Sequence, residues 1–213
     1  TQRPWCWYYR NGFNCYKAGG NQCYSVNGEN QLHAIFGGGP SFIVHPSDVA
    51  PALVALGAQF NVVGPDGNRS VAADQFFQLP ADNPQYENSL DRDELLAGVT
   101  VPAPSPSVRS TYEKIMDRQA WTHAVVSVAA VLEVEEGVCM SASIVLGGVA
   151  PVPWRASEAE AVLTGQRLTP ELVRRAGEAA VANARPLAKN RYKVPMTATV
   201  IERTVLSLAS QSA

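Results

Sequence analysis

The sequence predicts an α+β fold in which an antiparallel sheet packs on three helices. Two apolar, β-rich segments, 124–133 and 138–147, are separated by Glu135-Glu136-Gly137 and predict an antiparallel hairpin. Three segments with helix signals follow this hairpin along the chain. A hairpin sheet packed on three helices is an α+β arrangement. With 213 residues, the chain can bury a real core in one large domain or two small ones.

Composition excludes several classes of protein. Hydrophobic residues make up 46% of the chain and charged residues 17%, which is typical of an ordered globular protein. The net charge of −2 gives no reason to expect a nucleic-acid partner. No apolar run approaches the roughly 20 residues of a membrane span, and Thr1 to Arg10 lacks the apolar region of a signal peptide. Because the chain does not begin with Met, we expect it to be a processed or trimmed piece.

The first 30 residues predict an irregular, aromatic-rich loop that carries three of the four cysteines. Cys6, Cys15 and Cys23 follow the spacings C-x8-C and C-x7-C, which differ from the CxxC pair of a zinc site. Their clustering indicates a disulfide with a free thiol, three structural cysteines, or thiolates that wrap an iron–sulfur cluster. Cys139 lies inside the second hairpin strand and is predicted to be a buried structural cysteine.

A short strand, a polar corner and a helix come next. Residues 42–44 predict the strand and 45–48 the corner, and the helix that follows ends at Gly57. Ser47 or Asp48 is expected to cap this helix. A hydroxyl and a carboxylate at a helix start, beside a glycine run, form a natural place to hold a polar ligand.

Turn signals and periodicity predict the remaining elements. The expected elements are strands at 58–63, 68–72, 94–101 and 108–115, a helical turn at 74–77, and helices at 157–163, 170–183 and 192–209. The proline-rich run at 102–106 is the best boundary in the chain. We therefore divide the chain into residues 1–41, 42–106 and 107–213.

Two of the helix starts carry capping signals. Ser157 with Glu160 fits a capping box. Thr169 is expected to be an N-cap, because Pro170 follows it at the first helical position. The last helix tolerates Pro195, which falls in its opening turn.

Four stretches of this sequence resemble the FAD-binding (medium) subunit of molybdenum hydroxylases. They are HAIFGGGPSFIVHPSDVAPALVALGA from His33, the segment 114–118, LGGVAPVPWRASEAEAVLTG from Leu146, and NRYKVPMTATVIERTVL from Asn190. This is the xanthine dehydrogenase and carbon monoxide dehydrogenase flavoprotein family, especially its aldehyde oxidoreductase and hydroxybenzoyl-CoA reductase branches. The resemblance covers the chain in order and matches the C-terminal part of such a subunit. It implies the second half of an FAD-binding domain at 42–106 and a flavoprotein C-terminal domain at 107–213.

The resemblance implies four flavin contacts. Ser47 and Asp48 match a Ser-Asp pair near the ribityl chain and isoalloxazine, Leu96 a residue that packs on the ring, and Lys114 a lysine that approaches it. A lysine near the ring would stabilise the anionic reduced flavin. The ordinary alternatives are a helix cap for Asp48, a core position for Leu96 and a surface charge for Lys114.

The segment CWYYRNGFNCYKAGGNQCY looks like the loop that binds a [4Fe-4S] cluster in some of these subunits. Cys6, Cys15 and Cys23 match three of its ligand cysteines, whereas Ser41 stands where relatives have a cysteine. A serine or other fourth ligand, a three-iron cluster, and the absence of a cluster are the alternatives. His33 is a further candidate ligand, and the alternative for it is a hydrogen-bonded loop residue.

The resemblance implies an oxidoreductase component that helps to bind FAD and passes electrons between iron–sulfur clusters and an acceptor. Its expected partners form a heterotrimer with it: a molybdopterin-binding large subunit, which carries the substrate site, and a [2Fe-2S] small subunit. The flavin pyrophosphate site is expected on an upstream segment or a separate N-terminal FAD-binding chain, so we expect little FAD affinity from this chain alone.

Two other kinds of function remain open from the sequence. A non-catalytic assembly or docking module would use the aromatic loop to bind a partner subunit. An extracellular binding domain would contain a disulfide among Cys6, Cys15 and Cys23. For the electron-transfer subunit, the expected location is the cytoplasm. Export to the periplasm together with partner subunits is the alternative.

Overall fold

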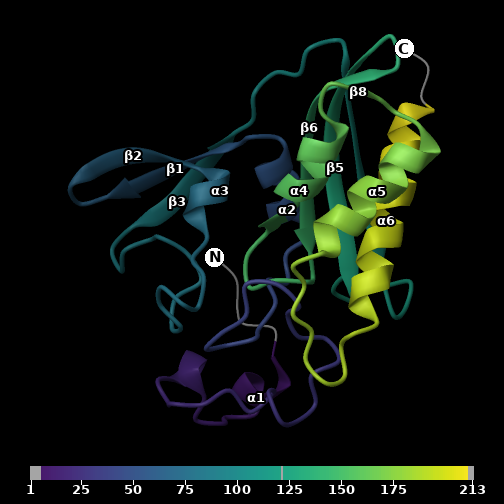
Figure 1. Cartoon of the computed structure of the whole chain (residues 1–213). Helices are drawn as coiled ribbons and strands as arrows, with labels where there is room; N and C mark the ends of the chain where they lie inside the picture. The colour runs from purple at the N-terminus through teal and green to yellow at the C-terminus, as the bar shows by residue number, and fades with distance from the viewer. Residues whose placement is uncertain (1–5, 121, 211–213) are drawn as a thin grey trace.

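A computed structural model of the chain describes residues 6–120 and 122–210, and its strands form two separate sheets (Figure 1). The larger sheet has five strands in the order β4-β5-β6-β7, with β8 paired to β6, and the smaller has three in the order β2-β1-β3. None of the helices within the described residues is long and apolar enough to cross a membrane.

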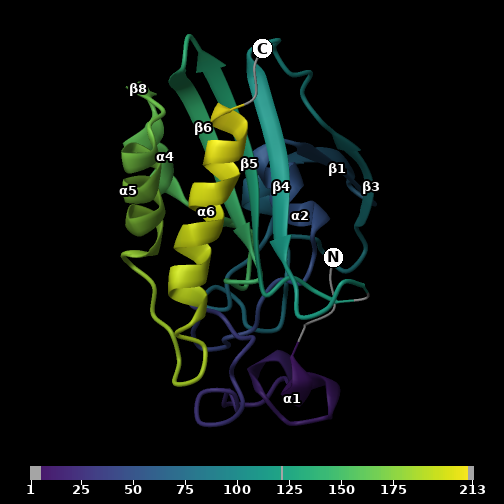
Figure 2. The same ribbon diagram turned by 90° about the vertical axis from the view of Figure 1, so that its right-hand side faces the viewer.

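The larger sheet and three helices form what we call the C-terminal layer. Its strands are β4 (Val108–Ile115), β5 (Val126–Glu135), β6 (Val138–Gly147), β7 (Trp154–Arg155) and β8 (Gln166–Arg167), and its helices are α4 (Ser157–Leu163), α5 (Pro170–Val181) and α6 (Lys193–Ala209). All the strand pairs are antiparallel. The helices lie on one side of this sheet (Figure 2). The predicted α+β arrangement of an antiparallel sheet on three helices is therefore confirmed.

The hairpin strands are nearly continuous apolar runs because both faces of the sheet are covered. Val128 and Leu132 of β5 face the helices and join the main core, whereas Ala129 packs with Val54 of α2 on the opposite side. Alternate residues of a strand point to opposite faces, so a strand buried on both sides needs apolar residues at every position. The two short strands β7 and β8 were not predicted, because two residues show no readable periodicity.

The smaller sheet lies on the other side of the larger one, with α2 between them (Figures 1 and 2). The strands of the smaller sheet are β1 (Gln59–Gly64), β2 (Gly67–Ala72) and β3 (Leu95–Thr100). Two helices accompany it, α2 (Val49–Ala55) and α3 (Ala73–Phe76). The β1–β2 hairpin pairs Gln59 with Ala72 and Gly64 with Gly67. Phe60 and Phe76 pack edge to face in its core, 4.7 Å between ring centroids.

Residues 6–41, which we call the cysteine loop, contain little regular structure. One helical turn, α1 (Trp7–Arg10), and one 3₁₀ turn, η1 (Tyr16–Ala18), are its only elements among the described residues. The strand predicted at 42–44 is wrong: Val44 forms an isolated bridge and no ladder follows. Its backbone bonds go instead to loops, with Phe42 accepting from Ala34 and His45 donating to Ala150.

The predicted capping box of α4 is also wrong, whereas the predicted cap of α5 is confirmed. Glu160 turns away from the helix start and accepts hydrogen bonds from Ile144 N (2.8 Å) and from Arg155 Nε. A buried carboxylate gains more from a buried N–H and a guanidinium than from an exposed helix end. Thr169 Oγ1 accepts from Leu172 N, with Pro170 next to it.

Candidate functional site

Asp48, Tyr112 and Lys114 form a hydrogen-bonded cluster between the start of α2 and strand β4. The Lys114 ammonium lies 2.6 Å from Asp48 Oδ2, and Tyr112 donates its hydroxyl to Asp48 Oδ1 at 2.9 Å. Lys114 also donates to the carbonyl of Thr122. Burial raises the pKa of Tyr112, so its hydroxyl is a donor at neutral pH. Two sequence-predicted site residues, 66 positions apart, are thus brought into direct contact.

The cap of α2 explains why the Asp48 carboxylate is available to this cluster. Ser47 Oγ accepts from Ala50 N at 3.1 Å, whereas Asp48 makes no side-chain cap bond. The two alternatives for the cap are therefore resolved in favour of Ser47. A short hydroxyl satisfies the helix start, and the neighbouring carboxylate turns toward a lysine and a phenol.

Ser47 and Leu96 lie on the wall of one apolar cavity of about 170 Å³, which Ser47 and Val49, the sequence neighbours of Asp48, line but Asp48, Tyr112 and Lys114 do not. Three phenylalanines contribute to the same wall: Phe60, Phe76 and Phe77. Leu96 is partly buried and packs against the core under the smaller sheet. An apolar cavity bordered by a few fixed polar groups suits a flat ligand with one polar edge, and the isoalloxazine of FAD is of that kind. The residues present therefore fit the ring portion of a flavin.

His45 lines the same cavity and was not predicted from the sequence. Burial lowers its pKa to about 3, so the ring is neutral. Its Nδ1 accepts from Ser47 N at 3.4 Å, which leaves the proton on Nε2. That nitrogen is buried without a hydrogen-bond partner among the described residues. Tyr112 was also missed, although its spacing of two from Lys114 places both on one face of a strand.

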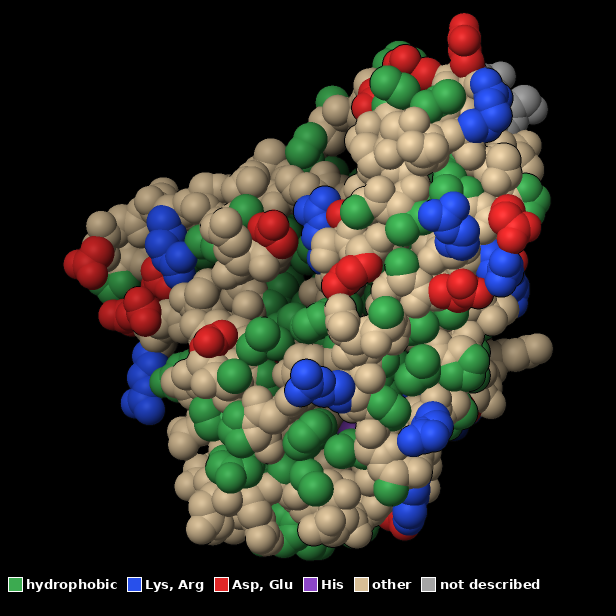
Figure 3. All heavy atoms as spheres, in the orientation of Figure 1, with side chains coloured by type: hydrophobic (Ala, Val, Ile, Leu, Met, Phe, Trp, Pro, Cys, Tyr) green, Lys and Arg blue, Asp and Glu red, His purple; other side chains and the backbone are tan. Residues whose placement is uncertain are grey.

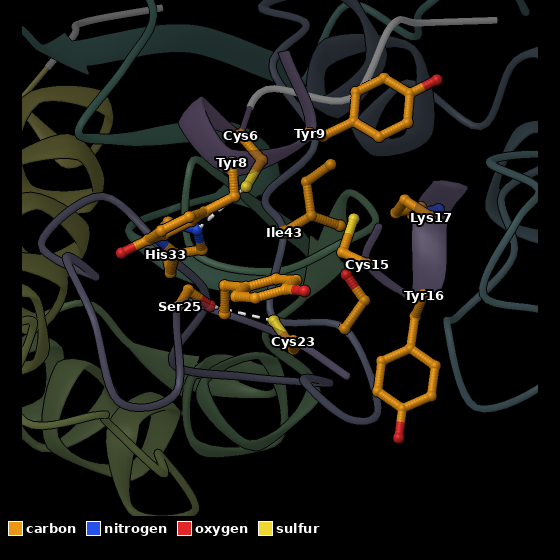
Figure 4. A pocket seen from close by; sticks show the side chains of 12 residues that line it. Cys6, Tyr8, Tyr9, Cys15, Tyr16, Lys17, Cys23, Ser25, His33 and Ile43 are labelled. Carbon is orange, nitrogen blue, oxygen red and sulfur yellow. Dashed lines mark hydrogen bonds between the residues drawn. The ribbon is translucent and has the colours of Figure 1, made fainter. Parts of the chain in front are cut away.

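Cys6, Cys15 and Cys23 line a second, enclosed pocket, together with Ser41 and His33 (Figure 4). The four cysteines are all free thiols, so the disulfide alternative is wrong for this structure. The thiols of Cys6 and Cys23 are partly buried and that of Cys15 is buried. Burial raises the pKa of Cys6, with smaller contributions from the other two thiols. The predicted burial of Cys139 in its strand is observed.

The donor types that line this pocket indicate the kind of metal group that it suits. Nowhere in the described ranges do three His, Cys, Asp or Glu side chains converge closely enough for one metal ion. The free space between these side chains is about 10 Å³, so they are closely packed against one another. Metal–thiolate bonds of about 2.3 Å are shorter than van der Waals contacts. Three thiols on one irregular loop are the ligand type of iron–sulfur clusters, so it is the donor set of this pocket, rather than its free volume, that fits such a group.

Long-range hydrogen bonds hold the cysteine loop in place. Lys17, which is buried, pairs with Glu87 at 2.6 Å and donates to the Tyr86 carbonyl. Lys193, at the start of α6, has no exposed surface and donates to the carbonyls of Leu32 (2.9 Å) and Gly148 (2.7 Å). Burial lowers the pKa of Lys193 to about 7. The loop is thus attached to both neighbouring parts of the chain.

Two family models match the chain. Residues 34–104 match the FAD binding domain in molybdopterin dehydrogenase, and residues 111–208 match the CO dehydrogenase flavoprotein C-terminal domain. The chain belongs to the flavoprotein family of the molybdenum hydroxylases. The family recognised from the sequence is therefore confirmed.

Individual members of this flavoprotein family support the match over most of the chain. The aldehyde oxidoreductase FAD-binding subunit PaoB of Escherichia coli (strain K12) is 31% identical over 195 residues, which are 91% of this chain and 57% of PaoB. The carbon monoxide dehydrogenase medium chain of Afipia carboxidovorans is 33% identical over 165 residues, 75% of this chain and 55% of that protein. The chain thus spans little more than half the length of these relatives.

A solved structure of carbon monoxide dehydrogenase from Hydrogenophaga pseudoflava has the same fold. It superposes with a TM-score of 0.70 at 30% identity, covering 78% of this chain and 60% of that one. These matches establish the family and the fold.

Proposed function

We propose that this chain is an electron-transfer flavin subunit of a molybdenum hydroxylase and an oxidoreductase component that helps to bind FAD. The observation that carries the proposal is the contact of Asp48 with Lys114 beside the cavity of Ser47 and Leu96, within the two matched family domains. FAD, when bound, supplies the chemistry of accepting and releasing electrons.

The side chains of this site have separable roles in the proposal. Leu96 and the phenylalanines exclude water from one face of the ring. Asp48 orients the Lys114 ammonium and can accept hydrogen bonds from ribityl hydroxyls. Lys114 supplies a positive charge beside Asp48, and in the proposal this charge stabilises the negative charge of the reduced flavin. Tyr112 fixes the second oxygen of Asp48.

The remaining parts of the flavin site and the assembly are proposed from the relatives. Their names describe an FAD-binding subunit and a medium chain. We therefore propose a molybdopterin-binding large subunit with the substrate site and a [2Fe-2S] small subunit as partners, and a pyrophosphate site on an upstream segment or separate chain. In the same proposal Cys6, Cys15 and Cys23 hold an additional iron–sulfur cluster, with Ser41 near its fourth corner.

Cofactor analysis of the chain purified with its native partners tests this function. We expect FAD in the complex and about four iron atoms with matching acid-labile sulfide attributable to this chain. Asp48→Ala and Lys114→Ala are expected to lower FAD content, whereas Glu178→Ala, an exposed residue of α5, serves as a control. Flavin without this iron would remove the cluster and leave the flavin role standing.

A docking module is the second candidate, and one surface favours it. Trp7 is 62% exposed and lines a pocket of about 660 Å³ with Leu32 and Arg10. Figure 3 shows hydrophobic side chains gathered on the lower half of the face in view, where the cysteine loop lies. A complex that contains neither flavin nor iron at this chain would favour docking over electron transfer.

A further inference from the structure

The imidazole of His33 lies against the thiol of Cys6 at the cysteine pocket. Its Nε2 lies 3.5 Å from Cys6 Sγ, and the residue is only 7% exposed (Figure 4). Its other ring nitrogen, Nδ1, is buried with no hydrogen-bond partner among the residues that the structure describes. Buried polar groups are normally hydrogen-bonded, and the contact with Cys6 Sγ is the hydrogen bond available to this ring among the described residues.

The chemistry of the pair decides which atom donates. A cysteine that holds iron does so as a thiolate, which has no proton to give. The imidazole must therefore carry its proton on Nε2 and donate it to Cys6 Sγ. The same tautomer is favoured without iron, because it leaves an acceptor rather than an N–H donor unpaired at Nδ1.

Residues from the far end of the sequence hold the histidine at this distance. The carbonyl of His33 accepts from Asn190 Nδ2 at 2.9 Å, and its own N–H donates to the carbonyl of Asn30. Lys193 holds the preceding carbonyl, that of Leu32. Asn30, Asn190 and Lys193 are all buried. These buried hydrogen bonds fix the backbone on both sides of the His33 side chain, and the imidazole is thereby held next to Cys6.

A second thiol has an equivalent neighbour. Ser25 Oγ lies 3.0 Å from Cys23 Sγ, and Ser25 is fully buried. When Cys23 is a thiolate, it has no proton to give, so the hydroxyl of Ser25 is the donor. Figure 4 shows both contacts on the walls of the same pocket.

We propose that His33 and Ser25 are positioning residues that donate hydrogen bonds to the thiolates of Cys6 and Cys23 and thereby raise the reduction potential of the iron–sulfur cluster. The inference rests on the proposed function, in which these cysteines hold a cluster. Reduction adds one electron to the cluster and increases the negative charge on its sulfur atoms. A donor N–H or O–H stabilises this reduced form more than the oxidised form.

The test is redox titration of the cluster, followed by electron paramagnetic resonance, in the complex purified with its partners. We expect His33→Phe to keep the iron content and lower the midpoint potential, because phenylalanine fills the space without a donor. A tenfold change in the ratio of oxidised to reduced cluster corresponds to 59 mV for one electron, and we expect a shift of roughly this order. His33→Gln, which retains a terminal N–H, is expected to recover part of it.

Ser25→Ala provides a second, independent variant with the same expected direction. Glu178→Ala, at an exposed position of α5, is the control and should leave the potential unchanged. Equal midpoint potentials for the wild type, His33→Phe and Ser25→Ala would overturn the inference. A wild-type complex without iron at this chain would instead overturn the proposed cluster, so the two failures are distinguishable.

A measurement on the wild type covers the case in which His33→Phe loses the cluster. With ¹⁵N-labelled histidine, pulsed electron paramagnetic resonance detects the coupling between the reduced cluster and the ring nitrogens. A weak coupling and an exchangeable proton near the cluster support a hydrogen bond. A strong coupling, as from a nitrogen bound to iron, would make His33 a ligand and overturn the inference, as would the absence of any coupling.

Discussion

The C-terminal layer and the cysteine loop are stabilised by different kinds of interaction. The layer buries continuous apolar strands between helices on one side and α2 on the other. The loop has few aliphatic residues. An aromatic cluster around Tyr8 and Phe13 packs its interior, and buried polar side chains such as Lys17 and Lys193 attach it to the rest of the chain. Apolar burial is non-directional and tolerates small shifts, whereas each buried hydrogen bond fixes one geometry. A site whose ligands must converge benefits from the second kind.

The largest expected effect concerns the cysteines of the two regions. Cys15→Ala should abolish or reduce the iron content several-fold, because a thiolate ligand is lost and alanine offers no replacement. Cys139→Ser, in the C-terminal layer, should keep the iron, since its Sγ already donates to the Ser141 carbonyl and serine can do the same. Iron and sulfide analysis of both complexes checks this, and equal iron in all samples would contradict the assignment.

Core truncation should separate the two regions by stability. Leu132→Ala removes a fully buried side chain of β5 and is expected to lower the free energy of unfolding by about 2–5 kcal/mol. Trp7→Ala removes an exposed side chain of the cysteine loop and should change it by about 0.5 kcal/mol or less. Denaturant unfolding of the purified complex measures both, and a large loss for Trp7→Ala would show that the ring contacts of Trp7 with Tyr8 and Phe13 are a main support of the loop.

Lys193 tests the buried polar attachment of the loop. Lys193→Met keeps the length of the side chain but leaves the carbonyls of Leu32 and Gly148 without this donor, which should lower stability by about 1–3 kcal/mol. Hydrogen exchange should increase in the cysteine loop more than in β5. Equal protection of the loop in both proteins would contradict the proposed attachment.

The same variant makes a prediction about pH. Between about pH 7 and the ordinary lysine pKa of 10.5, the unfolded chain keeps a proton on Lys193 that the folded chain has released. Because the unfolded state binds more protons in this window, the stability of the wild type should rise with pH there. The Asp117 carboxylate opposes the effect of burial by raising the pKa of Lys193, whereas His33, whose pKa is about 4, stays neutral in this window. Thermal unfolding should therefore show a wild-type advantage over Lys193→Met that grows from pH 7 to pH 10.

The smallest expected effect is on the flavin. Lys114→Met removes the positive charge beside Asp48 and should lower the two-electron flavin potential by about 30 mV, a tenfold change in the ratio of the two redox forms. Lys114→Arg keeps the charge and should retain most of the potential. Spectroscopic titration of the flavin in the complex checks the difference, and identical potentials in all three proteins would place Lys114 outside the flavin site.

Local patterns were enough to predict most of the elements. The bounds predicted for β4, 108–115, are those observed, and the Thr169 cap with Pro170 opens α5 as expected. Alternation and capping depend on residues within a few positions of one another, so a single sequence carries them. The strand predicted at 42–44 is absent because the backbone there bonds to loops, as His45 N does to the Ala150 carbonyl. The capping box failed because the Glu160 carboxylate accepts from Ile144 N instead of the helix start.

The sequence by itself determined the α+β fold, the family, and which residue types were available for chemistry. Only the tertiary structure decided which of them meet: Asp48 with Lys114, and His33 with both Cys6 and Asn190, the latter 157 positions away. It also placed Lys193, a residue type that usually lies on the surface, in the interior. Periodicity shows which face of an element is buried, but a hydrogen bond between distant side chains depends on how whole elements pack, and no local pattern records that packing.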